Sequence, residues 1–292
     1  MLYWIIILRE VRPLRINETA IFCDLDGTLF DHTGAVSERN REAIRRYTEA
    51  GGLFAIATGR CPGNMMEYLE GVAFNAPSIV LNGAGVYDCA NERFLYTRFA
   101  DSEAIAEVLF ECRAHHPSLD LQVYSERDIL YVSPEETVNR AFFELHRSSH
   151  FVSIEEALSA PWFKSLLFGP REDLAEIERF IIRRGLAERF DRVYASTDIV
   201  SGQEYLELLP KGINKGTALH ECRALDCYKG RILIAVGDYN NDLELLEEAD
   251  IAASPANANA AVKAITDMFL PSNNDDAIAA LTERLEESEA LY

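Results

Sequence analysis

Two carboxylates, Asp24 and Asp26, stand directly after the apolar run 20–23, and Gly27 follows them. An apolar run of this kind predicts a buried strand, so both carboxylates fall where that strand ends. A lone charge is costly to bury and two like charges repel, but a divalent cation would remove both difficulties. The first carboxylate could then attack a phosphorus atom and the second could move a proton. Gly27 would allow a sharp turn that directs backbone N–H groups at an anion, although the alternative interpretation is an ordinary turn with an Asp N-cap.

Other polar side chains follow apolar runs or begin predicted helices, and these are Thr58, Lys215, Asp238, Asn241 and Asp242. Alone, Asp238 could be a helix N-cap and Lys215 a surface lysine. Together they supply what phosphoryl transfer through an aspartyl-phosphate requires. A hard cation offsets the charge between nucleophile and phosphate, and Mg2+ suits this role because it takes few protein oxygens and several waters. A lysine ammonium, a hydroxyl and backbone N–H groups then bind the equatorial phosphoryl oxygens.

The elements that must position these residues alternate between strand and helix from residue 20 onward. Such alternation predicts a parallel sheet with right-handed crossovers, whose ligands bind beyond the carboxyl ends of the strands. Asp24, Thr58 and Asn82 fall at that edge. The expected elements of this part are strands 20–23, 53–57 and 78–81 and helices 37–47 and 64–70.

The pattern changes after Val86 to antiparallel α+β material, which is inserted into the parallel part. We expect helices at 102–115, 135–147 and 172–184 and strands at 119–124, 129–132, 164–168, 192–195 and 205–209. The segment 211–215 then returns the chain to the first part. There we expect helices at 217–225, 243–248, 256–265 and 275–286 and strands at 231–236, 251–253 and 268–270.

The composition is that of a globular protein, with 48% hydrophobic and 26% charged residues among 292. This length predicts about two domains. The formal charge of −20 opposes binding to nucleic acid or an anionic membrane and is compatible with binding divalent cations. The six cysteines are scattered and form no C-x-x-C pair, so we interpret them as reduced thiols of a cytoplasmic protein.

The chain begins with the apolar segment 1–8, after which Arg9, Arg12 and Arg15 follow. A signal peptide carries its basic residues before the apolar stretch and a small-residue cleavage site after it, and this segment has neither feature. It is also far too short to span a bilayer. We therefore expect an additional strand or an artefact of the chosen start codon, and no membrane partner.

Four segments resemble the motifs of the haloacid dehalogenase-like (HAD) superfamily in the order of that family. They are Asp24-Leu25-Asp26-Gly27-Thr28-Leu29, Thr58-Gly59-Arg60, Lys211-Gly212-Ile213-Asn214-Lys215-Gly216 and Gly237-Asp238-Tyr239-Asn240-Asn241-Asp242. Three further segments resemble the Cof-type branch of this superfamily, and they are Asn82-Gly83-Ala84, 254–258 and Val262-Lys263. The resemblance extends from Ile21 to Leu281 and is specific as a combination, whereas each motif alone is not.

The resemblance implies an α/β fold with a Rossmann-like (HAD-like) parallel-sheet core domain and an inserted α+β cap domain. The catalytic core would contain residues 1–84 and 211–292, and the cap, which chooses the substrate, residues 85–210. This sequence departs from the family where Leu245 or Leu246 replaces a frequent Met, and where Ser254-Pro255 replaces Met-Gly or Met-Pro. The first nineteen residues match nothing in the family.

The resemblance also implies a role for each site residue. Asp24 would be the nucleophile, and Asp26 would protonate the leaving alcohol and then activate water. Mg2+ would take carboxylates from Asp24 and Asp238 and the backbone carbonyl of Asp26. The phosphate would be bound by Thr58, Gly59, Lys215 and Asn241. Asp242 would orient Lys215 or lie behind the metal ligands.

We therefore expect a Mg2+-dependent phosphatase of a small phosphorylated metabolite, such as a sugar phosphate or pyridoxal phosphate. A phosphomutase of a sugar phosphate is the first alternative, and it would return the phosphoryl group to a second hydroxyl. A non-catalytic protein that binds a phosphorylated ligand is the second, although binding alone needs no proton shuttle such as Asp26. A dehalogenase is disfavoured, because in this family it keeps neither the second aspartate nor the metal. No single residue of the cap identifies the substrate, and the oligomeric state is open.

Overall fold

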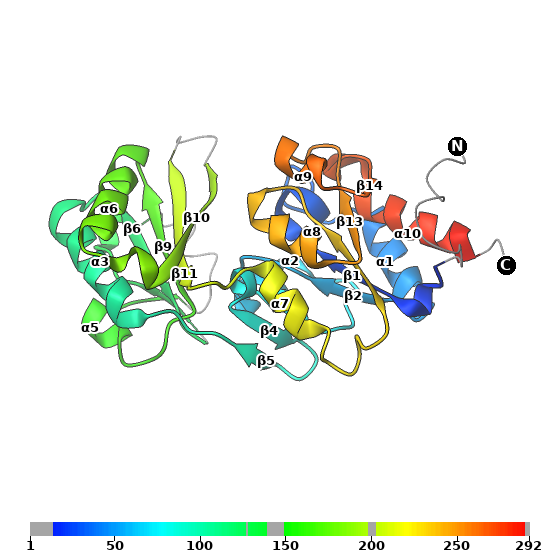
Figure 1. The fold of residues 1–292 in the computed structure, drawn as a ribbon, viewed down its shortest axis with the longest axis horizontal. Helices are drawn as coiled ribbons and strands as arrows, with labels where there is room; N and C mark the ends of the chain where they lie inside the picture. Colours follow the sequence, from blue (N-terminus) through cyan, green and yellow to red (C-terminus); the bar gives the residue numbers. More distant parts are fainter. Residues whose placement is uncertain (1–13, 127, 139–148, 198–202, 290–292) are drawn as a thin grey trace.

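The computed structural model describes residues 14–126, 128–138, 149–197 and 203–289 (Figure 1). These residues form two lobes (Figure 1), one around a five-stranded sheet and one around a six-stranded sheet. We call them the core lobe and the cap lobe. The core lobe combines segments from both ends of the described chain, and the cap lobe is made from its middle. The predicted fold class, a parallel-sheet α/β core with an inserted α+β part, is confirmed.

The sheet of the core lobe has the strand order β14-β13-β12-β1-β2, and every neighbouring pair is parallel. The strand β1 in its centre is buried along its whole length, as expected for a strand covered on both faces. The strands are β1 (Thr19–Cys23), β2 (Leu53–Ile56), β12 (Ile232–Val236), β13 (Ile251–Ser254) and β14 (Met268–Phe269).

Helices cover both faces of this sheet because successive side chains of a strand point to opposite sides. On β1, Ile21 and Cys23 pack with one group of helices, and Ala20 and Phe22 pack with the other. The first group is α1 (Glu38–Glu49), α2 (Pro62–Tyr68) and α10 (Ala277–Glu289). The second group, on the opposite face in Figure 1, is α7 (Lys215–Cys222), α8 (Leu243–Glu248) and α9 (Ala260–Ala264).

A small antiparallel sheet borders the core sheet, and it consists of β3 (Ser78–Val80), β4 (Gly85–Asp88) and β5 (Arg93–Thr97). The sequence predicts β3 as a third strand of the parallel sheet. In the structure β3 pairs with β4, and it is joined to the parallel sheet by a parallel bridge between Ala57 and Ile79 and by a hydrogen bond from the Ile56 N–H to Ser78 Oγ at 3.0 Å. The division into residues 1–84 with 211–292 and residues 85–210 stays a prediction.

The cap lobe contains a sheet of order β10-β11-β9-β6-β7-β8, which is antiparallel except for the pair β7–β8. Its helices α3 (Ser102–His115), α5 (Ile154–Ala157) and α6 (Arg171–Arg183) pack against the sheet over a separate apolar cluster (Figure 1). The strands are β6 (Asp120–Tyr124), β7 (Ile129–Tyr131), β8 (Ser149–Phe151), β9 (Lys164–Gly169), β10 (Phe190–Thr197) and β11 (Glu204–Pro210).

Several elements differ from their predicted bounds. The helix expected from 217 begins earlier, at Lys215, because Asn214 and Thr217 form a capping box at its start. The helix expected over 256–265 is confined to α9. The helix expected over 135–147 starts as a single 3₁₀ turn, Glu135–Thr137, and its remainder from 139 onward lies outside the described residues. The expected strand at 1–8, with Arg9 and Arg12, also lies outside them.

The described helices are all too short or too polar to cross a bilayer. All six cysteines are free.

The cap sheet contains a buried acidic residue, Asp120, for which the structure records no contact with a lysine or an arginine. Asp120 is 3% exposed, and its carboxylate accepts hydrogen bonds from Gln122 Nε2 at 3.4 Å and Ser133 Oγ at 3.3 Å. Burial raises the pKa of Asp120 to about 6, and the two hydrogen bonds lower it only in part. The carboxylate is therefore harder to ionise in the folded protein than in the unfolded chain.

Replacing Asp120 by Asn should stabilise the protein in a pH-dependent way. The unfolded side chain ionises near 3.8 and the folded one near 6, so native Asp120 lowers the free energy of unfolding as pH rises through that window. Asp120→Asn removes this loss, and we expect it to gain up to about 3 kcal/mol at about pH 7 and less than about 1 kcal/mol at about pH 4. Urea unfolding at both pH values measures the difference, with the exposed Asp275→Asn as control. An equal gain at both pH values would contradict the assignment.

Candidate active site

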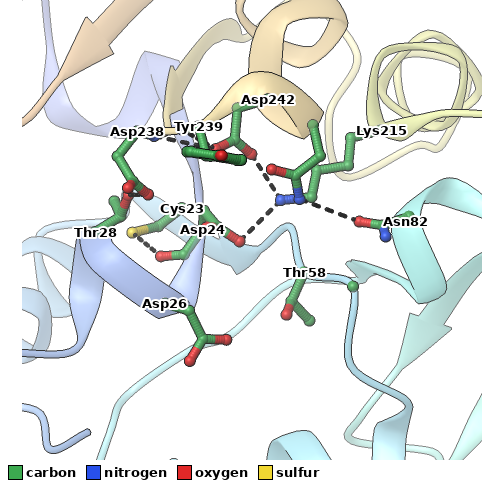
Figure 2. Close-up of polar contacts among 12 residues, drawn as sticks. Cys23, Asp24, Asp26, Thr28, Thr58, Asn82, Lys215, Asp238, Tyr239 and Asp242 are labelled. Atoms are coloured by element: carbon green, nitrogen blue, oxygen red, sulfur yellow. Dashed lines mark hydrogen bonds and ion pairs between the residues drawn. The ribbon is translucent and has the colours of Figure 1, made fainter. Parts of the chain in front are cut away.

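Asp24 lies at the carboxyl end of β1, where its backbone N–H donates to the Val236 carbonyl of the neighbouring β12 at 2.9 Å. Its side chain is only 6% exposed, and Oδ1 accepts a hydrogen bond from Lys215 Nζ at 2.8 Å (Figure 2). Burial raises the pKa of Asp24 well above its ordinary value, Lys215 opposes this shift, and the neighbouring carboxylates add to it. The predicted nucleophile therefore sits at the sheet edge that the sequence indicates.

Lys215 is the counter-charge of the site. Its fully buried ammonium bridges Asp24 and Asp242, with Nζ 2.6 Å from Oδ1 of Asp242. Burial lowers the pKa of Lys215, but the two carboxylates outweigh burial and raise it, so the side chain is charged. The second oxygen of Asp242 accepts from the N–H groups of Asp238 and Tyr239 at 3.0 and 3.2 Å. Asp242 thus holds both Lys215 and the loop that follows β12.

Asp238 approaches from that loop and lies over the turn that follows β1 (Figure 2). Thr28 Oγ1 donates to its Oδ1 at 2.9 Å. Burial and then the charge of Asp242 raise the pKa of Asp238 to about 6. Gly27 makes this approach possible, because a Cβ on Gly27 would stand 2.4 Å from a carboxylate oxygen of Asp238. Gly27 also has a φ of +79°, which favours glycine.

Three carboxylates converge here and could hold a metal ion. One oxygen of each of Asp24, Asp238 and Asp242 lies within 4.8 Å of the others. Hard oxygen donors fit Mg2+, and burial together with the neighbouring carboxylates raises the pKa values of Asp24 and Asp238, a shift that a bound cation would oppose. Asp242 differs from the other two because both of its oxygens already accept hydrogen bonds from the protein.

Asp26 points away from this cluster (Figure 2). Its side chain is 62% exposed and forms a two-pronged ion pair with Arg60, with contacts of 2.8 Å from Nη2 and 3.0 Å from Nε. The guanidinium of Arg60 also stacks on the rings of Phe30 and Tyr68, at 5.5 and 4.6 Å from the ring centroids. Asp26 is therefore a solvent-facing carboxylate whose direction is fixed by Arg60.

The residues predicted to bind phosphate lie around the carboxylate cluster, and each makes different contacts. Thr58 is buried beside Asp24, where its Oγ1 accepts from the N–H of Arg60 at 3.2 Å (Figure 2). Gly59 follows it in the same loop. Asn241 reaches across the site and donates from Nδ2 to Oδ1 of Asn82 at 3.4 Å. The assignment of Thr58, Gly59, Lys215 and Asn241 to a phosphate stays a prediction, as do the roles of Asp24, Asp26, Asp238 and Asp242.

Asn82 and Arg60 are named among the sequence motifs, but the sequence assigns neither of them a role in the site. Asn82 falls at the predicted sheet edge, but its contact with Asn241 connects loops that are 159 positions apart. Arg60 is recognised only as part of a motif, and its pairing with Asp26 depends on how two loops meet. A polar residue at the end of an apolar run is the signal for Asn82, whereas no sequence signal predicts the partner of Arg60.

A family described as haloacid dehalogenase-like hydrolase matches residues 21–281. Among curated proteins, a 5-amino-6-(5-phospho-D-ribitylamino)uracil phosphatase of Bacillus subtilis is 25% identical over 287 residues, which cover 91% of this chain and 97% of that protein. A pyridoxal phosphate phosphatase of Escherichia coli is 23% identical over 270 residues, covering 89% and 95%. The crystal structure of a haloacid dehalogenase-like hydrolase from Bacteroides thetaiotaomicron has a TM-score of 0.77 at 25% identity, covering 91% of this chain and 99% of that one.

Removing the ammonium of Lys215 should destabilise the fold strongly. Lys215→Met leaves Asp24 and Asp242 facing each other in a buried place, and losing one partner of a buried ion pair costs about 3–5 kcal/mol. The matched control is Lys229→Met, which removes the exposed pair of Lys229 with Asp226 and should cost less than about 1 kcal/mol. Urea unfolding of both variants at neutral pH measures the difference. Equal losses in the two variants would show that Lys215 does not compensate the buried carboxylates.

Proposed function

The chain belongs to the haloacid dehalogenase-like hydrolases, and we propose that it is a Mg2+-dependent phosphatase of a small phosphorylated metabolite. The phosphoryl group would pass through Asp24. The observation that carries this proposal is the buried Lys215 between Asp24 and Asp242, with a carboxylate of Asp238 beside them. Fixed positive charge next to a nucleophilic carboxylate is what transfer of an anionic phosphoryl group needs.

Asp24 and Asp238 would hold the Mg2+ through their carboxylates, with the backbone carbonyl of Asp26 as a third protein ligand. When bound, the ion offsets the negative charge between the nucleophile and the phosphate. Asp242 orients Lys215 and the loop of Asp238, which its existing hydrogen bonds support. Thr58, Gly59, Lys215 and Asn241 bind the phosphoryl oxygens.

In the first half of the reaction, an oxygen of Asp24 attacks the phosphorus as the bond to the leaving oxygen breaks. Asp26 donates its proton to that oxygen, so the alcohol leaves neutral. In the second half, Asp26 accepts a proton from a water molecule that attacks the same phosphorus. The bond between Asp24 and phosphorus then breaks, which restores the free carboxylate and releases inorganic phosphate.

The exposure of Asp26 supports its place in this sequence of steps. A proton shuttle must reach both a leaving alcohol and a water, and Asp26 faces solvent rather than the buried cluster. In the ion pair with Arg60 both oxygens of Asp26 are engaged and the carboxylate is ionised, so this pair must open before Asp26 takes up the proton that it donates. A protein that only binds a phosphorylated ligand would have no use for such a group.

The cap lobe would close over the substrate, exclude water and choose the leaving group. A small phosphomonoester is supported by the relatives, two of which are named for the dephosphorylation of small metabolites. We also propose a cytoplasmic location, which the six free cysteines support.

A screen of phosphorylated metabolites, with and without Mg2+, tests the proposal. We expect release of inorganic phosphate from at least one sugar phosphate or pyridoxal phosphate, and only with Mg2+. Asp24→Asn serves as the blank because its amide is no nucleophile and cannot carry the phosphoryl group. Isomerised sugar phosphate without release would instead indicate a phosphomutase. Binding without turnover in both proteins would indicate a non-catalytic phospholigand-binding protein.

Asp26→Ala should lower kcat by about a hundredfold or more, since general acid–base catalysis contributes about 10²–10⁴. The loss should be smaller with p-nitrophenyl phosphate, whose leaving group needs little protonation, than with an alkyl phosphate. Asp31→Ala is the control, because Asp31 lies in the same segment but its side chain bonds only Thr33 and Ala35 among the contacts that the structure records. Equal losses with both leaving groups would contradict the role as proton donor.

A further inference from the structure

A second buried ion pair lies where the cap lobe meets the core lobe. Lys164 begins β9 and Glu207 lies in the neighbouring strand β11, and Lys164 Nζ is 2.7 Å from Oε1 of Glu207. Their side chains are only 3% and 7% exposed. Neither residue takes part in the proposed reaction, so this pair needs a separate explanation.

Both charges also bind loops of the core lobe. Lys164 Nζ donates to the carbonyl oxygen of Gly59 at 2.8 Å. Asn82 Nδ2 donates to the second oxygen of Glu207 at 2.6 Å. Gly59 directly follows Thr58, and Asn82 accepts from Asn241. The ion pair of the cap therefore contacts two of the loops that carry the proposed phosphate-binding groups.

The ammonium of Lys164 is saturated by these contacts. It carries three N–H bonds, and the described residues around it offer three partners: Glu207, Gly59 and the ring face of Tyr124 at 4.7 Å. Each oxygen of Glu207 likewise has its own donor. Groups that are fully engaged within the protein hold its geometry rather than bind a ligand.

The loop of Asn82 transmits this contact toward Lys215. Leu81 and Asn82 have φ angles of +55° and +53°, so the backbone turns in the left-handed region. Gly83 follows with a φ of +96°, and a Cβ on it would stand only 2.0 Å from the carbonyl oxygen of Asn214. The turn is thus pressed against the start of α7, where Lys215 is the first residue.

The net stability from a buried ion pair is small, because desolvation offsets the attraction, and apolar replacement of both partners is often tolerated. We therefore expect Lys164 and Glu207 to fix the positions of the loops that they contact and to add little to the free energy of unfolding. Their four recorded contacts connect three cap strands, β6, β9 and β11, with two core loops.

We infer that Lys164 and Glu207 are positioning residues: docked from the cap, they hold the Gly59 carbonyl and the Asn82 side chain, and so the geometry of the phosphate-binding groups. The inference rests on the proposed function for its kinetic consequence. The contact itself is independent of that function.

The test is the double variant Lys164→Met/Glu207→Leu, in which neither charge is left unpaired. The control is Arg171→Met/Glu204→Leu, which removes an ion pair of 2.9 Å that also involves β11 but has no recorded hydrogen bond to the loops of Gly59 and Asn82. Three measurements are made with Mg2+ present. They are the affinity for inorganic phosphate, kcat and KM with p-nitrophenyl phosphate, and hydrogen exchange of the amides at 58–60 and 81–83.

In the double variant, we expect about a tenfold weaker affinity for phosphate, at least a tenfold lower kcat/KM, and faster exchange confined to these two loops. The control should match the native protein in all three measurements. Native exchange and native phosphate affinity in the double variant would overturn the inference. If the native protein hydrolyses nothing but the two loops loosen in the variant, the proposed function fails while the positioning contact stands.

The variant Asn82→Gly provides a second test, which leaves the ion pair of Lys164 and Glu207 in place. Glycine accepts the left-handed backbone at this position, so the change removes only the side-chain link to Glu207 and Asn241. We expect faster exchange at 81–83 and weaker phosphate binding. If Glu207 acts through Asn82, adding Asn82→Gly to the double variant should weaken binding less than it does alone. Fully additive effects would overturn this part of the inference.

Discussion

The ammonium of Lys215 is the interaction on which the site depends. It lies between Asp24 and Asp242, all three are almost completely buried, and they come from segments that are 191 and 27 positions apart from Lys215. Without the positive charge, two carboxylates would face each other in a dry environment. The fold must therefore bring β1, α7 and the loop after β12 together before these three charges can compensate one another.

Close backbone approach is the second condition. A Cβ on Gly27 would collide with the carboxylate of Asp238, and one on Gly237 would stand 2.4 Å from the carboxyl carbon of Asp242. Gly83 plays the same part against the start of α7. Each glycine removes a side chain where a charged group or a helix end must come near. The loops of the site can approach one another closely because these glycines have no side chains at the points of contact.

The sequence predicts the elements near the site well, because their signals are local. The apolar runs before Asp24 and Asp238 end where charge begins, and both strands lie in the parallel sheet as expected. The pairing of Asp26 with Arg60 is not predictable in this way, since it depends on how two loops pack. Lys164 and Glu207 are harder still. A charge in a strand is normally taken as solvent-facing, and only the docking of the two lobes buries this pair.

The strand β11, which carries Glu207, ends at Pro210, and α7 begins with Lys215 only a few residues later. One short segment therefore contributes both to the contact between the lobes and to the buried charges of the candidate active site. The cap is consequently not an interchangeable part that evolution or an engineer could swap freely. On the positioning role inferred for Lys164 and Glu207, a foreign cap would have to bring its own contacts for the loops of Gly59 and Asn82, and without them we expect activity to fall toward every substrate rather than to change in preference.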